Sequence, residues 1–432
     1  MRITMLTIGP HGAVAPLVTF GRKLQAAGHE VKLGTNANYE NLVTRNGLAF
    51  AAIAPDATRM VNAKTTDQQF RAANHPIKYY LALRAEAREI SAGAMRVLDR
   101  CVEVSHGAEV LLYHGHLFAA DAIAAHLKIP GIQAYNTPVT PTREFPSYIA
   151  LRPWAGPSTY NRITHTIRDL VTWLPYRPLI NRWRRSSLGL PPLPLDGPYR
   201  DLDRRRVPLL YSTSPTILPK PADWGDWIHL AGPWLADDDP AWVPPPELTR
   251  FLEAGPPPVS IGFGSMKFGD PKRLTRIVVE ALQQARLRAV LLTGWNALDA
   301  EGLPDTIYAC SQIPHRWLFS RVAAAVHGGG IGTLTASLRA GLPTLAVPFG
   351  GDSTLWGWRC AQIGAGPAPI PIRKLTSENL ASALRALTTD ASYRYRAEQA
   401  GESIRAEEEA DYSIDVFQTA LRQASTGTQS SS

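Results

Sequence analysis

The segment AAAVHGGGIGTLTASLRAGLPTLAV, residues 323–347, carries the pattern that decides the fold of this chain. It opens with a short apolar run typical of a buried strand, and residues 343–347 form a second such run. Between them lie a glycine-rich turn, residues 327–333, and a stretch with helical spacing that ends at Ala340. A strand, a turn, a helix and a second strand in this order predict a parallel sheet covered by helices.

The same alternation extends outward through both halves of the chain. In the second half, strands are predicted at residues 259–263 and 289–292, with a helix at about 273–284 between them. The strands predicted for the first half are residues 3–8, 30–34, 110–113 and 131–135. We therefore expect an α/β fold with two Rossmann-like, doubly wound lobes that face each other across a cleft.

Proline density marks the expected boundary between the lobes. Eight prolines fall within residues 232–258, a density that favours a semi-rigid connector. The expected divisions are a first lobe at 1–234, a linker at 235–258, a second lobe with a C-terminal helix at 259–424, and a disordered polar tail at 425–432.

The composition is that of a globular protein. Hydrophobic residues make up 45% of the 432 residues and charged residues 19%, and no apolar run reaches the roughly 18 residues of a membrane span. The cysteines, Cys101, Cys310 and Cys360, are too widely separated for a zinc site or a disulfide framework. We expect a cytoplasmic protein without a bound metal or resident cofactor.

Most of the excess positive charge lies in one segment. The whole chain has a net charge of +8, and residues 143–206 contain 12 Arg, no Lys and five acidic residues. Such a segment favours phosphate groups or an anionic membrane surface, or is an ordinary solvated surface. Nucleic acid is not an expected partner, because no nucleic-acid-binding module accompanies the arginines.

The glycine-rich turn is the first candidate for chemistry. A helix that follows such a turn directs backbone N–H groups and its positive end toward a ligand, so an anion binds there more tightly than a neutral group. Gly264 follows another predicted strand and is expected at the same edge of the sheet. The same glycines could instead be needed only because the strand and the helix pack closely together. Nucleotide hydrolysis and NAD chemistry are disfavoured, because the chain lacks a Walker sequence here and a G-x-G-x-x-G spacing in its first turn.

Several longer motifs resemble one family. They are Pro16 with the following helix, AGHEV at 27–31, the segment 138–146, IGFGSM at 261–266, IPHRWLF at 313–319 and above all the block 326–371. Together they resemble the nucleotide-sugar-dependent glycosyltransferases of GT-B fold, within them the sterol and natural-product glycosyltransferases. The similarity spans most of the chain.

The resemblance implies an inverting, metal-independent transfer of glucose or a deoxysugar from a UDP- or dTDP-sugar to a lipophilic acceptor. Ser265, Thr333 and the amides of the turn would hold the diphosphate, the Gln312–Ile313 segment would frame the base, and Asp352 would face the sugar hydroxyls. The implied donor site comprises Gly264, Ser265, Gln312, Ile313, His327, Gly329, Gly330, Gly332, Thr333, Asp352 and Ser353.

Three positions depart from the family pattern. Ala13 stands where the family usually has an Asp or His that deprotonates the acceptor. Gly328 replaces the second of two consecutive histidines, and Ser353 replaces a sugar-binding glutamine.

These departures leave two interpretations open. In the first, the base has moved, and the candidates are His11 in the same loop and His114 or His116 after the strand 110–113. In the second, the chain binds a ligand or partner, or runs a different reaction, without sugar transfer.

Two candidate side chains also have structural alternatives. Asp352 is a candidate for the reaction itself, although it could instead cap the backbone after Gly351. His327 could be a scaffold histidine.

Overall fold

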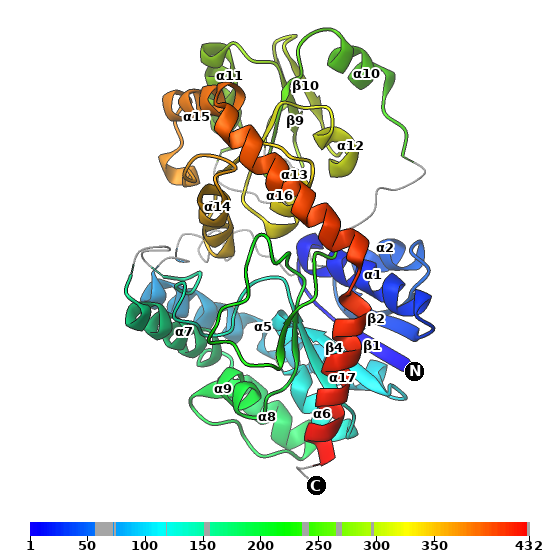
Figure 1. The fold of residues 1–432 in the computed structure, drawn as a ribbon. Coiled ribbons are helices and arrows are strands. Elements are labelled where there is room, and N and C mark those ends of the chain that lie inside the picture. Colours follow the sequence, from blue (N-terminus) through cyan, green and yellow to red (C-terminus); the bar gives the residue numbers. More distant parts are fainter. Residues whose placement is uncertain are drawn as a thin grey trace. The chain divides into compact units, whose positions relative to one another are not determined.

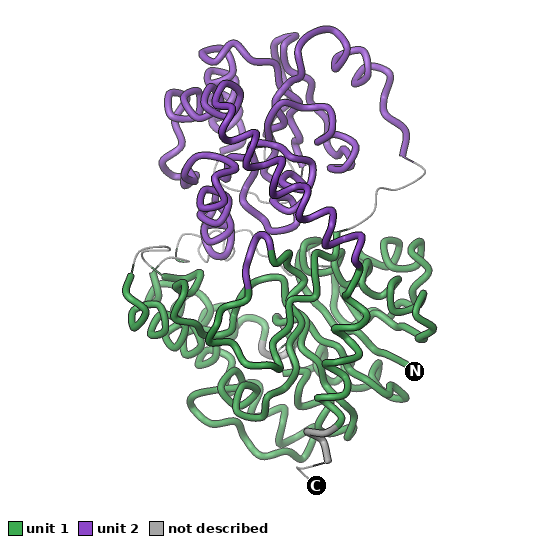
Figure 2. The backbone as a smooth tube through the Cα atoms, in the orientation of Figure 1, with its two compact units in different colours: residues 1–215, 220–236, 411–432 green, residues 216–219, 237–410 purple. Residues whose placement is uncertain are grey.

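The computed structural model contains two compact units (Figures 1 and 2). Unit 1 comprises residues 1–215, 220–236 and 411–432, and unit 2 comprises residues 216–219 and 237–410. The residues that the structure describes are 1–56, 72, 75–117, 119–150, 156–235, 242–264, 270–294 and 298–429.

Unit 1 is built on a seven-stranded parallel sheet with the order β3-β2-β1-β4-β5-β6-β7. Its strands are β1 Arg2–Leu6, β2 Glu30–Asn36, β3 Ala49–Ala54, β4 Val110–His114, β5 Gly131–Tyr135, β6 Leu209–Tyr211 and β7 Ile228–Leu230. The strand order reverses between β1 and β4, which pair directly through Ile3 and Val110. The loops after β1 and β4 lead to opposite faces of the sheet and leave a crevice at the carboxyl ends of these strands. Open α/β sheets bind their ligands in such a crevice.

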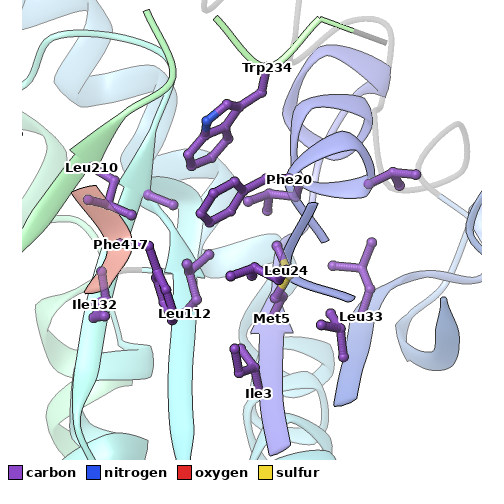
Figure 3. Close-up of a cluster of buried hydrophobic side chains, with 14 of the residues drawn as sticks. Ile3, Met5, Phe20, Leu24, Leu33, Leu112, Ile132, Leu210, Trp234 and Phe417 are labelled. Atoms are coloured by element: carbon purple, nitrogen blue, oxygen red, sulfur yellow. The ribbon is translucent and has the colours of Figure 1, made fainter. Parts of the chain in front are cut away.

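Helices cover both faces of this sheet. They are α1 His11–Ala26, α2 Glu40–Thr44, α5 Pro76–Ser105, α6 Ala120–Leu127, α7 Ser158–Trp173, α8 Arg177–Leu188, α9 Gly197–Arg204 and α17 Ser413–Gln429, with short 3₁₀ turns at Ala37–Tyr39 and Gly115–Leu117. On one face, α1 buries Leu17, Phe20 and Leu24, whose helical spacing places them on one side of the helix. Figure 3 shows Phe20 of α1 with Trp234 and Phe417 near the strand residues Met5 and Leu112.

Unit 2 is built on a five-stranded parallel sheet with the order β10-β9-β8-β11-β12. The strands are β8 Val259–Gly262, β9 Ala289–Leu292, β10 Ile307–Cys310, β11 Ala324–His327 and β12 Thr344–Ala346. The helices are α10 Pro246–Glu253, α11 Pro271–Ala285, α12 His315–Phe319, α13 Ile331–Arg339, α14 Asp352–Ile363, α15 Ser377–Thr389 and α16 Ala391–Ala410, with a 3₁₀ turn at Ile372–Lys374. The strand order again reverses in the centre, between β8 and β11, where His327 pairs with Gly262.

The units differ from the predicted divisions in three places. The C-terminal helix α17 belongs to unit 1, because its Phe417 is 0% exposed in the same core as Phe20. This helix continues to Gln429, so residues 425–429 are helical where a disordered tail was predicted. The proline-rich linker contains a helix, α10, whose Leu248 is buried in the core of unit 2.

No helix in the described part of the chain is long and apolar enough to span a bilayer.

The position of α17 predicts a large effect of one side chain on stability. Phe417→Ala removes a fully buried ring that packs edge-on against Phe20, at 6.0 Å between ring centroids. We expect the free energy of unfolding to fall by about 3–5 kcal/mol in urea titrations. The control is Tyr395→Ala on α16, where the ring is 57% exposed. A loss no larger than that of the control would contradict the packing of α17 in this core.

Candidate functional site

The turn after β11 is closed on one side and open on the other. A Cβ atom at Gly329, where φ is +83°, would lie 2.6 Å from the carbonyl oxygen of Ser353, and one at Gly328 would lie 3.2 Å from the Phe349 ring. Gly330 and Gly332 are exposed, and a Cβ atom at either would meet no atom within 4 Å. The first two glycines therefore allow close packing, and the last two leave space above the backbone.

The helix α13 begins at the open end of this turn. Its N-cap is Gly330 in an extended conformation, so no side chain at that position caps the first N–H groups. The first four N–H groups of a helix have no partner within the helix, and they carry a partial positive charge. The N–H groups of Ile331, Gly332 and Thr333 are thus suited to an anion.

His327 is part of the hydrogen-bond network of the turn. Its Nδ1 accepts a hydrogen bond from the Gly329 N–H at 3.0 Å, which places the ring proton on Nε2. The side chain is only 4% exposed. Burial and, to a smaller extent, the nearby His315 together lower the pKa of His327 to about 3. The ring is therefore neutral at physiological pH and shapes the turn, which favours the scaffold interpretation.

The helix α14 begins beside this turn. Its N-cap is Gly351, and Asp352 is its first residue, half-buried at the positive end of the helix. The Ser353 hydroxyl donates a hydrogen bond to the Gly350 carbonyl at 2.7 Å. Because Gly329 packs against Ser353, the starts of α13 and α14 lie together.

The other predicted donor residues are distributed around this edge of the sheet. Gly264 is exposed in the left-handed region, at φ +65°, two residues beyond the end of β8. Gln312 is exposed after β10, whereas the Ile313 side chain is 3% exposed and packs in a core cluster with Leu318. Ile313 can therefore contribute to a base site mainly through its backbone. Ser265 lies outside the described residues.

In unit 1, His11 is the first residue of α1 and not a loop residue as expected. The side chain is exposed, and its ring lies 6.4 Å from that of Tyr39. The surrounding protein still removes part of the water around the ring, and this effect and the charge of Arg45 both lower the pKa of His11. The imidazole is therefore mainly neutral at pH 7 and able to accept a proton.

His114 ends β4 and is 5% exposed. Its Nε2 lies 3.4 Å from Asn136 Oδ1, and Asn136 Nδ2 donates to the Gly12 carbonyl at 3.0 Å. His114 and Ala13 both line a narrow hollow with Pro16, Leu17, Ala134, Tyr135, Asn136, Ser212 and Trp234. The structure therefore places His114 beside Ala13 in this hollow, and His11 is not among the residues that line it. The side chain of His116 lies outside the described residues.

Asn136 is a site residue that the sequence analysis did not identify. It follows β5, the neighbour of β4, so its position after a strand at the carboxyl edge was the available signal. In the part of the chain that the structure describes, no three His, Cys, Asp or Glu side chains form a group suited to a metal ion.

The buried His327 predicts a specific pH dependence of stability. The pKa of His327 is about 3 in the folded chain, below the usual 6.5, so the unfolded chain binds the proton more readily. The stability that the neutral ring contributes is present above pH 6.5 and is lost as the pH falls toward 3, by about 1.4 kcal/mol per pH unit. His327→Asn should therefore lose less stability than the wild type between pH 6.5 and 4.5.

Urea titrations at three pH values measure this difference, with the exposed His126→Asn as the control for losing a histidine. The same pH dependence in His327→Asn and in the wild type would show that His327 is not buried in its neutral form.

Two family models match the chain. The Glycosyltransferase family 28 N-terminal domain matches residues 3–144, and the Erythromycin biosynthesis protein CIII-like C-terminal domain matches residues 289–412. The first match contains β1, α1 and β4, and the second contains the turn after β11 and the start of α14.

Sterol 3-beta-glucosyltransferases are similar over almost the whole chain. That of Cryptococcus neoformans var. neoformans serotype D (strain JEC21) is 34% identical over 448 residues, which cover 98% of this chain and 27% of the relative. That of Emericella nidulans is 33% identical over 441 residues, which cover 99% of this chain and 30% of the relative. The chain thus spans less than a third of the length of these relatives.

Solved glycosyltransferase structures share the fold. CalG4, the calicheamicin glycosyltransferase, superposes with a TM-score of 0.69 at 17% identity and covers 97% of this chain and 98% of its own. VinC in complex with dTDP superposes with a TM-score of 0.66 at 18% identity and covers 99% of this chain and 100% of its own. The fold is therefore GT-B, and the chain resembles the sterol and natural-product glycosyltransferases, as its motifs predict.

Proposed function

We propose that the chain is a glycosyltransferase that moves a sugar from a UDP- or dTDP-linked donor to a lipophilic acceptor. The observation that carries this proposal is the start of α13, where a glycine N-cap and open space leave backbone N–H groups available to a diphosphate. The names of the similar proteins support the reaction class and the lipophilic acceptor: sterol 3-beta-glucosyltransferase for the relatives and dTDP for one solved neighbour.

The donor site follows from the two neighbouring helix starts. The amides of Gly332 and Thr333 would bind the diphosphate oxygens, and their fixed dipoles would stabilise the negative charge that develops when the diphosphate leaves. This stabilisation requires no metal ion. Asp352 would accept hydrogen bonds from the sugar hydroxyls. The Ser353 hydroxyl donates its only proton to Gly350, so it can accept from a sugar hydroxyl but not donate to the sugar, which supports a deoxysugar donor.

The reaction would be a single displacement. The acceptor oxygen attacks the anomeric carbon from the side opposite the diphosphate, so the bond to phosphate breaks as the new glycosidic bond forms and the configuration inverts. The hydroxyl proton passes to a general base, and the electron pair of the broken bond leaves with the nucleoside diphosphate.

We assign His11 as the base. It is exposed, and its lowered pKa keeps the ring neutral at pH 7, so that it can take the acceptor proton. His114 is nearly buried and is held by Asn136, an arrangement that favours a supporting role beneath α1.

A GT-B protein that binds a ligand without sugar transfer is the second candidate. The observation that favours it is the triple departure at Ala13, Gly328 and Ser353, together with the hydrogen bond that occupies the Ser353 hydroxyl. A cytoplasmic location stays a prediction from the sequence.

Nucleotide binding tests the donor site directly. Calorimetry with UDP and dTDP should detect binding, and Gly332→Asp should weaken it by about tenfold or more, because it adds a negative charge at the start of α13. The control is Ala391→Asp, which adds a carboxylate at the exposed start of α16. The donor assignment fails if neither nucleotide binds, or if both variants bind equally. Nucleotide binding without transfer or donor hydrolysis would favour the second candidate.

Activity against pH tests the base. His11→Ala should lower kcat/KM by about 10² to 10⁴ with a neutral hydroxyl acceptor. In the wild type, kcat/KM should fall with decreasing pH around a midpoint below 6.5, and Arg45→Ala should move that midpoint upward because a positive charge is lost. Unchanged activity in His11→Ala would remove this residue from the reaction, with exposed His126→Ala as the control.

A further inference from the structure

Exposed apolar side chains concentrate on two helices of unit 1. Of the eight large hydrophobic residues that are exposed in the described part of the chain, four lie on α5 and α7. They are Ile77, 67% exposed, Leu81, 55%, Ile163, 51%, and Ile167, 38%. Each helix contributes a pair four residues apart, and such pairs occupy one face of a helix. Apolar residues exposed at unrelated positions would not form two such pairs.

The two helices are firmly held. They pack against each other, and Tyr176, just beyond α7, donates a hydrogen bond of 2.5 Å to Glu86 of α5 (Figure 1). The opposite face of α7 buries Arg168, which donates to the Val139 carbonyl at 2.6 Å and pairs with the buried Asp169. The exposed isoleucines therefore belong to a helix whose opposite face is well packed, and not to a frayed helix terminus.

The exposed charge on the two helices is mainly positive. On the first half of α5, Lys78, Arg84 and Arg88 are exposed together with one exposed carboxylate, Glu89. The helices α7 and α8 contain six arginines and one acidic residue, Asp169, and that residue pairs with Arg168 in the interior. Arg162, Arg182 and Arg185 are exposed. An ordered helix pair with bulky aliphatic side chains and neighbouring exposed arginines has the composition of a surface that binds anionic lipid.

We propose that the exposed face of α5 and α7, with the exposed cations of the same helices, Arg162, Lys78, Arg84 and Arg88, docks on an anionic membrane surface. The isoleucines and the leucine enter the boundary between headgroups and acyl chains, and these cations pair with the lipid phosphates. Arg162 belongs to the Arg-rich segment 143–206. The proposal does not depend on sugar transfer, because it uses no residue of the donor site and none of the candidate bases.

Flotation of the full chain with vesicles tests the proposal. We expect binding to vesicles of phosphatidylcholine with phosphatidylglycerol, weaker binding to phosphatidylcholine alone, and loss of binding in high salt. The double variant Ile163→Glu/Ile167→Glu should lower partitioning on the order of tenfold or more. Matched controls are Val243→Glu, 77% exposed, and Tyr395→Glu, 57% exposed, both in unit 2.

Circular dichroism confirms that each variant is folded before its binding is compared. The proposal is overturned if the wild type does not float with anionic vesicles, or if the double variant and the controls bind equally. It is also overturned if sedimentation shows that the wild type self-associates through this face and that the double variant abolishes self-association without changing vesicle binding. Titration of the same samples with UDP and dTDP measures the donor site separately, so a failure of vesicle binding can be distinguished from a failure of nucleotide binding.

Discussion

The close approach of Gly329 to the backbone of Ser353 is the contact on which the architecture of unit 2 depends. A Cβ atom at this position would lie 2.6 Å from the Ser353 carbonyl oxygen, so any other residue would push the two segments apart. With glycine there, α13 and α14 start side by side at the carboxyl edge of the sheet. Two positive helix ends then face the same region, and the field that an anion experiences there is the sum of both.

The family pattern has a second histidine where this chain has Gly328, and the packing accounts for the glycine. Gly328 faces the Phe349 ring at a distance of 3.2 Å from its Cβ position, so a larger side chain would have to displace that ring. The remaining histidine, His327, turns inward and fixes the Gly329 amide. In this arrangement the buried imidazole of His327 holds the turn in place, and a ligand would contact only the backbone of the turn.

The strands and the GT-B fold could be predicted from the sequence, because buried parallel strands such as 259–262 and 324–327 are short, mainly apolar runs that are followed closely by glycines. Other features depend on tertiary contacts. The helix α17 packs in unit 1 through Phe417, a long-range contact with Phe20 that no local pattern reveals. The sequence did not predict the start of α1 at His11, because Pro10 and Gly12 are typical of a loop, although proline is tolerated where a helix begins, since the first N–H groups of a helix have no partner within it. Asn136 acts through its amide, which contacts His114 and also Gly12, a residue 124 positions earlier in the sequence than Asn136.

The central claim is that backbone amides at the start of α13 hold a diphosphate. Selective ¹⁵N-glycine labelling of the full chain, followed by titration with dTDP and UDP in heteronuclear NMR, observes these amides one by one. The account predicts downfield shifts of the Gly332 and Gly330 amide protons, and a smaller change at Gly329, whose N–H already donates to His327. Saturable binding that leaves the Gly330 and Gly332 signals unchanged, and shifts only glycines elsewhere in the chain, would contradict it.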